Sequence, residues 1–178
     1  HKPVFNSNNN NHDVLFIGYP EKERIDSILY LASNGFKIDI YGYPNAWLKY
    51  NINHENIKNH EKSLHGKEYA EAITNSKITL CFLRKINRDL HTSRSIEIPA
   101  CKGFMLAERT NEHIDLFEED KEAVYFGTNE ELLQKVNYYL INEQERLRIS
   151  KNGYDKCLNN KYSYDDIVIK IINKVVKL

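Results

Sequence analysis

Short apolar runs alternate with amphipathic segments along most of this chain of 178 residues. The run at 14–17 is continuously apolar and stops at Gly18, which is typical of a buried parallel strand entering a turn. The segment 25–32 then repeats apolar residues at helical spacing and ends before an Asn-Gly pair. A second strand is expected at 37–41, so the pattern opens with a β–α–β unit.

The same alternation continues to the C-terminus after residues 44–65, which are rich in Asn and His and are expected to be mainly irregular. Further strands are expected at 62–65, 78–83, 104–107 and 123–126. Further helices are expected at 67–75, 94–101, 114–117, 128–141, 143–159 and 164–177, the last packing its Ile167, Ile171 and Val175 face on the protein. The pattern therefore predicts an α/β fold: a Rossmann-like, mainly parallel sheet of six strands with helices on both faces.

Composition narrows the class of protein. Hydrophobic residues make up 41% and charged residues 28% of the chain, which is typical of a globular domain at 13–178, preceded by a flexible lead-in at 1–12. Lys plus Arg and Asp plus Glu are both 25, so a broad basic surface for nucleic acid is not expected. The sequence has no run long enough for a membrane span and no signal peptide, and its three distant cysteines favour reduced thiols. These features predict a cytoplasmic location.

Several familiar motifs are missing. No G-x-G-x-x-G follows the first strand and no P-loop sequence occurs, which argues against a dinucleotide fingerprint and a P-loop NTPase. Gly18 and Arg84 stand where a phospho-receiver domain needs acidic residues. His54, His60 and His65 lack a zinc-like spacing and are expected to be exposed loop residues.

The region after the strand at 78–83 carries the most informative polar residues. In the common doubly wound strand order, the ends of this strand and of the first strand flank the crevice where the order reverses. Residues 18–24 and 84–97 are therefore expected around one site. Thr92 and Ser93 are N-cap residues, and a helix beginning there offers free N–H groups and a positive dipole end to a diphosphate.

Arg94 and Glu97 are three residues apart and share one face of the helix that follows. A guanidinium binds phosphate oxygens in a bidentate manner, and a carboxylate accepts hydrogen bonds from ribose hydroxyls. This combination favours a sugar nucleotide over a bare sugar or a free base. The alternative is an ordinary surface ion pair behind a helix cap, against which Pro99 argues mildly because it removes an intrahelical bond.

Three stretches of the chain resemble a known family. They are DVLFIGYPEKERIDSILYLASNGFKIDIYG at 13–42, DLHTSRSIEIPACKGFMLAERTNEHIDLFEEDKEAVYF at 89–126 and ELLQKVNYYLINEQERLRISKNGYDKCL at 131–158. The sequence looks like the C-terminal domain of group 1 glycosyltransferases. The resemblance is most specific in the R-x-x-E-I-P-A-C segment. Within that family it is most similar to the spore-maturation CgeB-like subgroup.

The resemblance implies the GT-B fold, in which two Rossmann-like domains form the enzyme and the C-terminal one holds the nucleotide-sugar donor. It also implies a missing N-terminal domain with the acceptor site, and the chain begins at His1 rather than Met. Many relatives carry a Glu-x7-Glu motif, and Asp89 and Glu97 fall on its two acidic positions. By this resemblance Asp89 is the candidate catalytic residue near the donor sugar, Glu97 holds the ribose and Arg24 faces the diphosphate.

Together these interpretations predict a set of donor-binding residues: Glu97, Arg94, Ser93, Thr92, His91, Arg24, Gly18 and Tyr19. The predicted function is the donor-binding domain of a glycosyltransferase that needs its N-terminal domain for turnover and has an unknown acceptor. No metal or other cofactor is expected besides the nucleotide-diphosphate sugar. The alternative is a degenerate, non-catalytic domain for nucleotide binding or assembly, which the Asp at position 89 and the loss of the relatives' Gly-rich sequence favour.

Overall fold

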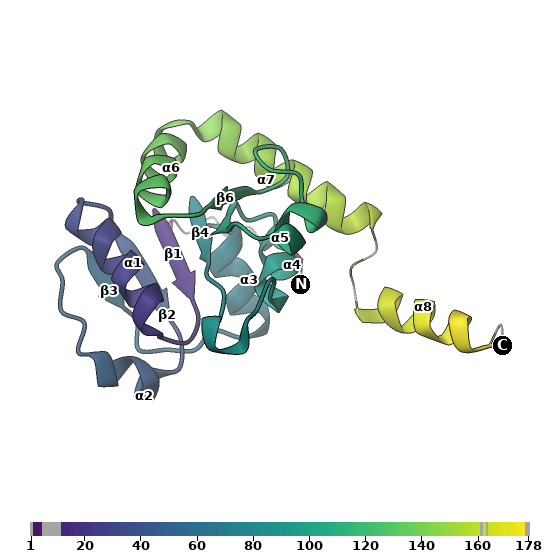
Figure 1. The fold of residues 1–178 in the computed structure, drawn as a ribbon, viewed down its shortest axis with the longest axis horizontal. Coiled ribbons are helices and arrows are strands. Elements are labelled where there is room, and N and C mark those ends of the chain that lie inside the picture. The colour runs from purple at the N-terminus through teal and green to yellow at the C-terminus, as the bar shows by residue number, and fades with distance from the viewer. Residues whose placement is uncertain (1, 5–11, 161, 163, 177–178) are drawn as a thin grey trace.

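The computed structural model describes residues 2–4, 12–160, 162 and 164–176. Six parallel strands form one sheet in the order β3–β2–β1–β4–β5–β6 (Figure 1). The strands are β1 (Val14–Ile17), β2 (Ile38–Tyr41), β3 (Ile57–Asn59), β4 (Ile78–Cys81), β5 (Met105–Glu108) and β6 (Val124–Phe126). The predicted Rossmann-like fold is confirmed, and the strand order reverses between β1 and β4.

Two layers of helices cover the sheet, because the side chains of each strand alternate between its faces. On one face, residues such as Phe16 and Leu80 pack on α1 (Lys22–Ser33), α2 (Pro44–Trp47) and α6 (Asn129–Ile141). On the other face, residues such as Leu15 and Met105 pack on α3 (Gly66–Thr74), α4 (Ser93–Ala100) and α7 (Glu143–Asn159). The central strands β1 and β4 are buried throughout, which explains their continuous apolar sequence.

The third strand was misplaced by the sequence pattern. The prediction of a strand at 62–65 is wrong, since β3 spans Ile57–Asn59 and pairs with β2 through Ile38 and Ile57. Glu61 then adopts a left-handed conformation with φ of 48°, which ends the extended run before Lys62. A three-residue strand surrounded by Asn and His has too few apolar positions to show a period.

The segment predicted to be irregular contains further order. It holds α2 and the 3₁₀ turn η1 (Leu48–Tyr50). Trp47 is 1% exposed, and its indole N–H donates to the Gly18 carbonyl at 2.9 Å. A single buried aromatic residue thus anchors this connection to the end of β1.

The two ends of the chain are described to different extents. The Asn-rich stretch at 6–11 lies outside the described residues, whereas the Val4 amide donates to Thr74 and His12 contacts Asp39. At the other end, α8 (Tyr164–Val176) stands apart from the domain (Figure 1).

The prediction that α8 packs its apolar face on the protein is wrong for the side chains that are described. Ile171 is 57% and Val175 64% exposed, and the side chain of Ile167 is outside the described set. Helical periodicity identifies an apolar face but not what covers it.

Of the helices within the described ranges, none is long and apolar enough to cross a membrane.

The remaining α-helix, α5 (Asn111–Leu116), is capped by Thr110, whose hydroxyl accepts a hydrogen bond from the His113 amide at 3.1 Å. It starts three residues before the predicted helix at 114–117. Cys81, Cys101 and Cys157 are unpaired and buried, as predicted.

Candidate functional site

The candidate site begins at the end of β1, where two glycines allow close packing. A Cβ atom on Gly18 would lie 2.7 Å from the Phe16 ring, and one on Gly42 would lie 2.2 Å from the Gly18 carbonyl oxygen. The Gly18 carbonyl accepts the hydrogen bond from the Trp47 indole. Gly18 therefore shapes the loop after β1 through close packing. The following Tyr19 is 46% exposed.

Arg24 connects the loops that follow β1 and β4. Its side chain is 3% exposed, and it donates from Nη1 to the Tyr19 carbonyl at 2.9 Å and from Nε to the Leu83 carbonyl at 3.3 Å. Its Nη2 lies 3.6 Å from the Glu21 carboxylate but has no hydrogen-bond acceptor among the described residues. Arg24 is therefore locked at the switch point with one donor left over.

The surroundings of Arg24 disfavour its positive charge. Burial lowers the pKa of its guanidinium, Glu21 opposes this, and the nearby Arg94 cation lowers the pKa further. Two guanidinium groups that disfavour one another create a positive potential that an anion relieves.

The start of α4 is held by a chain of buried hydrogen bonds. The Thr92 amide donates to the Ser95 hydroxyl oxygen at 3.0 Å, and Ser95 lies 2.7 Å from Nε2 of His113. His113 Nδ1 lies 2.6 Å from the Glu108 carbonyl, which can only accept, so the ring proton is on Nδ1 and Nε2 accepts from Ser95. Burial lowers the pKa of His113 and keeps the ring neutral. The helix terminus is thereby fixed in position.

Arg94 in the first turn of α4 and Glu97 one turn later have different surroundings. The Arg94 Nε is buried and is without a hydrogen-bond partner in the part of the chain that the structure describes. Glu97 accepts a hydrogen bond from the Tyr69 hydroxyl of α3 at 2.8 Å. Burial of the Tyr69 hydroxyl raises its pKa, and the Glu97 charge raises it further, so Tyr69 remains a donor.

The loop between β4 and α4 carries the remaining predicted residues. His91 Nδ1 pairs with the Glu112 carboxylate of α5. Asp89 is half-buried, and its amide donates to the Arg84 carbonyl at 3.3 Å. Arg84 pairs with Glu21 at 2.7 Å and lies 5.6 Å from the centre of the Tyr19 ring, which joins this loop to the one after β1.

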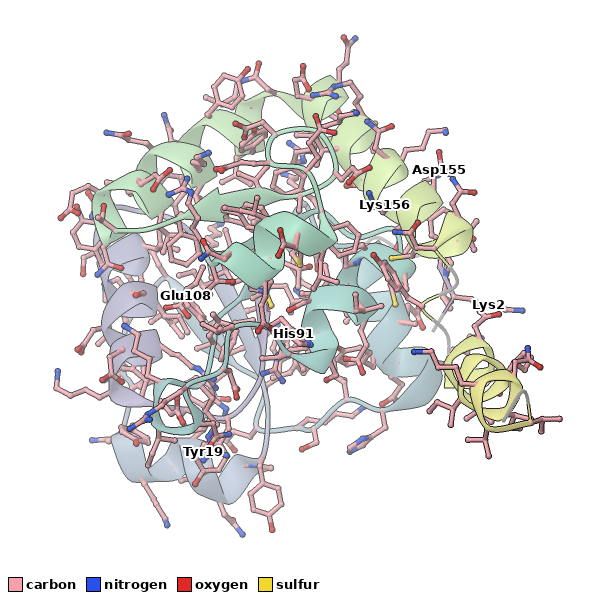
Figure 2. The ribbon with its side chains drawn as sticks, turned by 45° about the vertical axis from the view of Figure 1, so that its right-hand side comes forward. Lys2, Tyr19, His91, Glu108, Asp155 and Lys156 are labelled. Atoms are coloured by element: carbon pink, nitrogen blue, oxygen red, sulfur yellow. The ribbon has the colours of Figure 1, made fainter. Side chains whose placement is uncertain are left out.

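The structure brings the predicted residues to one edge of the sheet. In Figure 2, Tyr19, His91 and Glu108 belong to three strand ends or loops on this side, whereas Asp155 and Lys156 lie on α7. The sequence interpretation missed four residues that position the site: Glu21, Tyr69, Glu108 and His113. Glu108 accepts the Leu83 amide at 2.7 Å, which is why β4 ends before the predicted residue 83. For Glu21 and Glu108 the signal in the sequence was a polar residue that follows or ends an apolar strand, whereas Tyr69 and His113 lie within the helices α3 and α5.

A doubly wound parallel sheet with helices on both faces, whose strand order reverses between β1 and β4, defines a Rossmann-like domain. Residues 24–173 match the model of the glycosyl transferase-like family, and the chain belongs to that family. No curated protein matches the sequence.

Solved structures share the fold at low sequence identity. The C-terminal domain of a group 1 family glycosyl transferase (LpcC) from Francisella tularensis has a TM-score of 0.61 and 13% identity over 85% of this chain and 86% of that domain. Anabaena HepE, solved with UDP-glucose, has a TM-score of 0.70 and 13% identity over 94% of this chain and 49% of its own length. The pneumococcal O-GlcNAc transferase GtfA, solved with UDP and GlcNAc, has a TM-score of 0.62 and 14% identity over 99% and 38%. The chain thus spans less than half of the two longer relatives.

Proposed function

We propose that this domain binds the nucleotide-diphosphate sugar of a glycosyltransferase at the switch point between β1 and β4. The observation that carries the proposal is a pair of guanidinium groups, the buried one of Arg24 and the half-buried one of Arg94. Each has an N–H group without an acceptor among the described residues. A diphosphate supplies the charge and the oxygen acceptors that such donors need. The structural relatives solved with UDP or UDP-glucose support the same class of ligand.

The residues take distinct roles in this proposal. Arg24, Arg94 and the Ser93 amide at the start of α4 bind the diphosphate, whereas the Thr92 amide is already bound by the Ser95 hydroxyl. Glu97, already oriented by the Tyr69 hydroxyl, accepts the ribose hydroxyls. Asp89 and His91 are the candidates nearest the donor sugar.

In the transfer step the bond between the anomeric carbon and the diphosphate oxygen breaks as a bond to an acceptor oxygen forms. The acceptor's proton passes to a base, and the leaving diphosphate takes up negative charge. Fixed donors aimed at that charge stabilise it without reorganisation, and the mechanism needs no metal at this site. The acceptor site and the base belong to an N-terminal GT-B domain, so this chain alone binds the donor but does not turn it over.

A second function rests on the pairing of His91. Its ring is engaged by Glu112, and Arg84 by Glu21, so part of the loop is held by protein partners. This favours a degenerate domain that binds a nucleotide for sensing or assembly. Donor hydrolysis or transfer by the full-length cytoplasmic protein distinguishes the two functions. Measurable turnover excludes the degenerate, non-catalytic function. Under both functions, we propose that the chain belongs to the CgeB-like subgroup.

The first experiment is a thermal-shift panel of UDP, GDP, dTDP and ADP sugars on this domain. A ligand present at 100 times its dissociation constant stabilises the native state by about 2.7 kcal/mol, which is readily seen. We expect one nucleotide class to raise the melting temperature and free sugars to have no effect. A panel without any shift contradicts donor binding.

The second experiment compares two substitutions by calorimetric titration with the best ligand. Glu97→Gln keeps the size of the side chain but removes the charge, and we expect the dissociation constant to rise about ten- to hundredfold through loss of a charge-assisted bond to ribose. Arg94→Ala should weaken nucleoside diphosphates more than nucleosides. If only Arg94→Ala has an effect, the ribose assignment is wrong, and if neither does, the site itself is wrong.

A further inference from the structure

Three side chains from separate parts of the sequence meet on the α3 side of the sheet. Asp39 of β2 lies between two imidazoles, with Nδ1 of His12 at 2.9 Å and Nε2 of His60 at 2.6 Å from its two carboxylate oxygens. One ligand atom from each residue can be chosen so that all three lie within 4.8 Å of one another. The prediction that His60 is an exposed loop residue is wrong, because its side chain is 19% exposed, whereas His65 is exposed as expected.

The backbone holds this cluster in place. His12 leads into β1 and its carbonyl accepts the Lys77 amide at 2.8 Å, while the His60 amide donates to the Ile40 carbonyl of β2 at 3.0 Å. Tyr41 stacks on the His60 ring with centroids 4.1 Å apart, and the His12 ring meets the edges of both. Ligands that are already oriented by the fold lose little freedom on binding an ion.

A cavity of about 370 Å³ opens beside the two histidines, between the sheet and α3. Glu68, Glu71 and Lys62 are among the residues that line it. Together with Asp39 the charged groups here are three carboxylates and one ammonium. This balance favours a cation, and the cavity leaves room for a water molecule as a further ligand.

We propose that His12, Asp39 and His60 form a binding site for Zn²⁺ or a similar first-row transition metal ion. Two imidazole nitrogens and one carboxylate oxygen are the ligand set of many sites with an open fourth position, at metal–ligand distances of about 2.0–2.2 Å. Nitrogen ligands favour Zn²⁺, Co²⁺ or Cu²⁺ over Mg²⁺ and Ca²⁺, which take oxygen ligands. The ion replaces the two histidine–aspartate hydrogen bonds and ties the entry of β1 to the β2–β3 edge.

This site is separate from the proposed donor site. The cluster lies beside β2 and β3, whereas the donor residues follow β1 and β4. Zinc binding and nucleotide binding therefore stand or fall independently. The sequence shows no metal-binding motif because the three ligands lie 27 and 21 positions apart. They meet only through parallel strand pairing.

The test is a titration of the metal-free chain with Zn²⁺ against a chromophoric chelator, together with the visible spectrum of the Co²⁺ form. We expect one ion per chain, a rise in melting temperature and Co²⁺ absorption of a site with nitrogen ligands. His12→Ala and His60→Ala should each raise the dissociation constant at least about tenfold, since each removes one of three protein ligands. His65→Ala is the matched control and should bind as wild type does.

A change in folding is separated from a loss of ligands by Asp39→Asn and by the Co²⁺ spectrum. Asp39→Asn retains a hydrogen-bonding side chain but weakens the ion's charged ligand, so it should lower affinity while the chain remains folded. If the wild type binds no Zn²⁺, or if the three variants bind it as tightly as His65→Ala does, the proposal is overturned and the cluster is a hydrogen-bonded histidine–aspartate–histidine triad.

Discussion

Arginines in two regions of this domain differ in how far their hydrogen-bond donors are satisfied by the protein. Beyond β5, Arg109 reaches two carboxylates, at 2.7 Å from Glu119 and 2.5 Å from Glu131, and also the Tyr125 carbonyl at 3.1 Å. These bonds raise the pKa of its guanidinium. At the switch point, burial lowers the pKa of Arg24, and both Arg24 and Arg94 retain a donor without an acceptor in the described part of the chain.

The difference separates a structural use of arginine from a use in binding. A guanidinium whose donors are satisfied by its own protein stabilises the fold and has nothing to offer a ligand. One whose donors are buried and unsatisfied destabilises the fold slightly, and such a cost is typical of a site shaped for a partner. Three experiments test whether this distinction holds.

The largest effect is expected from removing both switch-point guanidiniums. Arg24→Met together with Arg94→Met should weaken nucleoside diphosphate binding more than about 100-fold, since each charge-assisted contact contributes about 1.5–3 kcal/mol. Calorimetric titration with the diphosphate and with its nucleoside measures the effect, and the nucleoside should lose far less. Equal losses for both ligands would show that the two arginines support the fold of the site rather than bind phosphate.

The opposite pattern is expected for the paired arginine. Arg109→Met should lower the free energy of unfolding by about 1–2 kcal/mol, because Glu119 and Glu131 then face each other without their shared cation. Lys135, 3.5 Å from Glu119, limits the loss. Urea unfolding measures this change, while nucleotide affinity should equal that of the wild type. A selective loss of nucleotide binding would remove the distinction between the two regions.

The smallest effect concerns pH. The hydrogen bonds from Arg109 are the main cause that lowers the pKa of Glu131 to about 2 from an ordinary value of 4.5. A carboxyl whose pKa is depressed on folding stabilises the protein fully above pH 4.5 and progressively loses that contribution as the pH falls toward 2. Because Glu131 is partly exposed, about 1 kcal/mol is expected to be lost across this range. The acid limb of the stability curve should be flatter in Arg109→Met, and identical curves would contradict the pairing.

The sequence predicted the sheet well because β1 and β4 are buried on both faces and leave continuous apolar runs. It also identified the start of α4, since Thr92 and Ser93 carry a local signal for a helix terminus. It misplaced β3 and missed the Tyr69–Glu97 bond, because both depend on neighbours that are distant in the sequence. The exposure of the apolar face of α8 was not predicted for a related reason. Periodicity shows that a helix has an apolar side but not whether anything packs against it.

The anchoring of Arg24 has a consequence for the speed of recognition. Its guanidinium is held by the Tyr19 and Leu83 carbonyls before any phosphate arrives, so no rotamer search has to follow the first encounter. A rigid cation at the switch point lets charge attraction guide an anion into place, and such association is fast and slows as salt is added. Phosphate ligands of equal charge should therefore associate at similar rates and differ in how fast they dissociate.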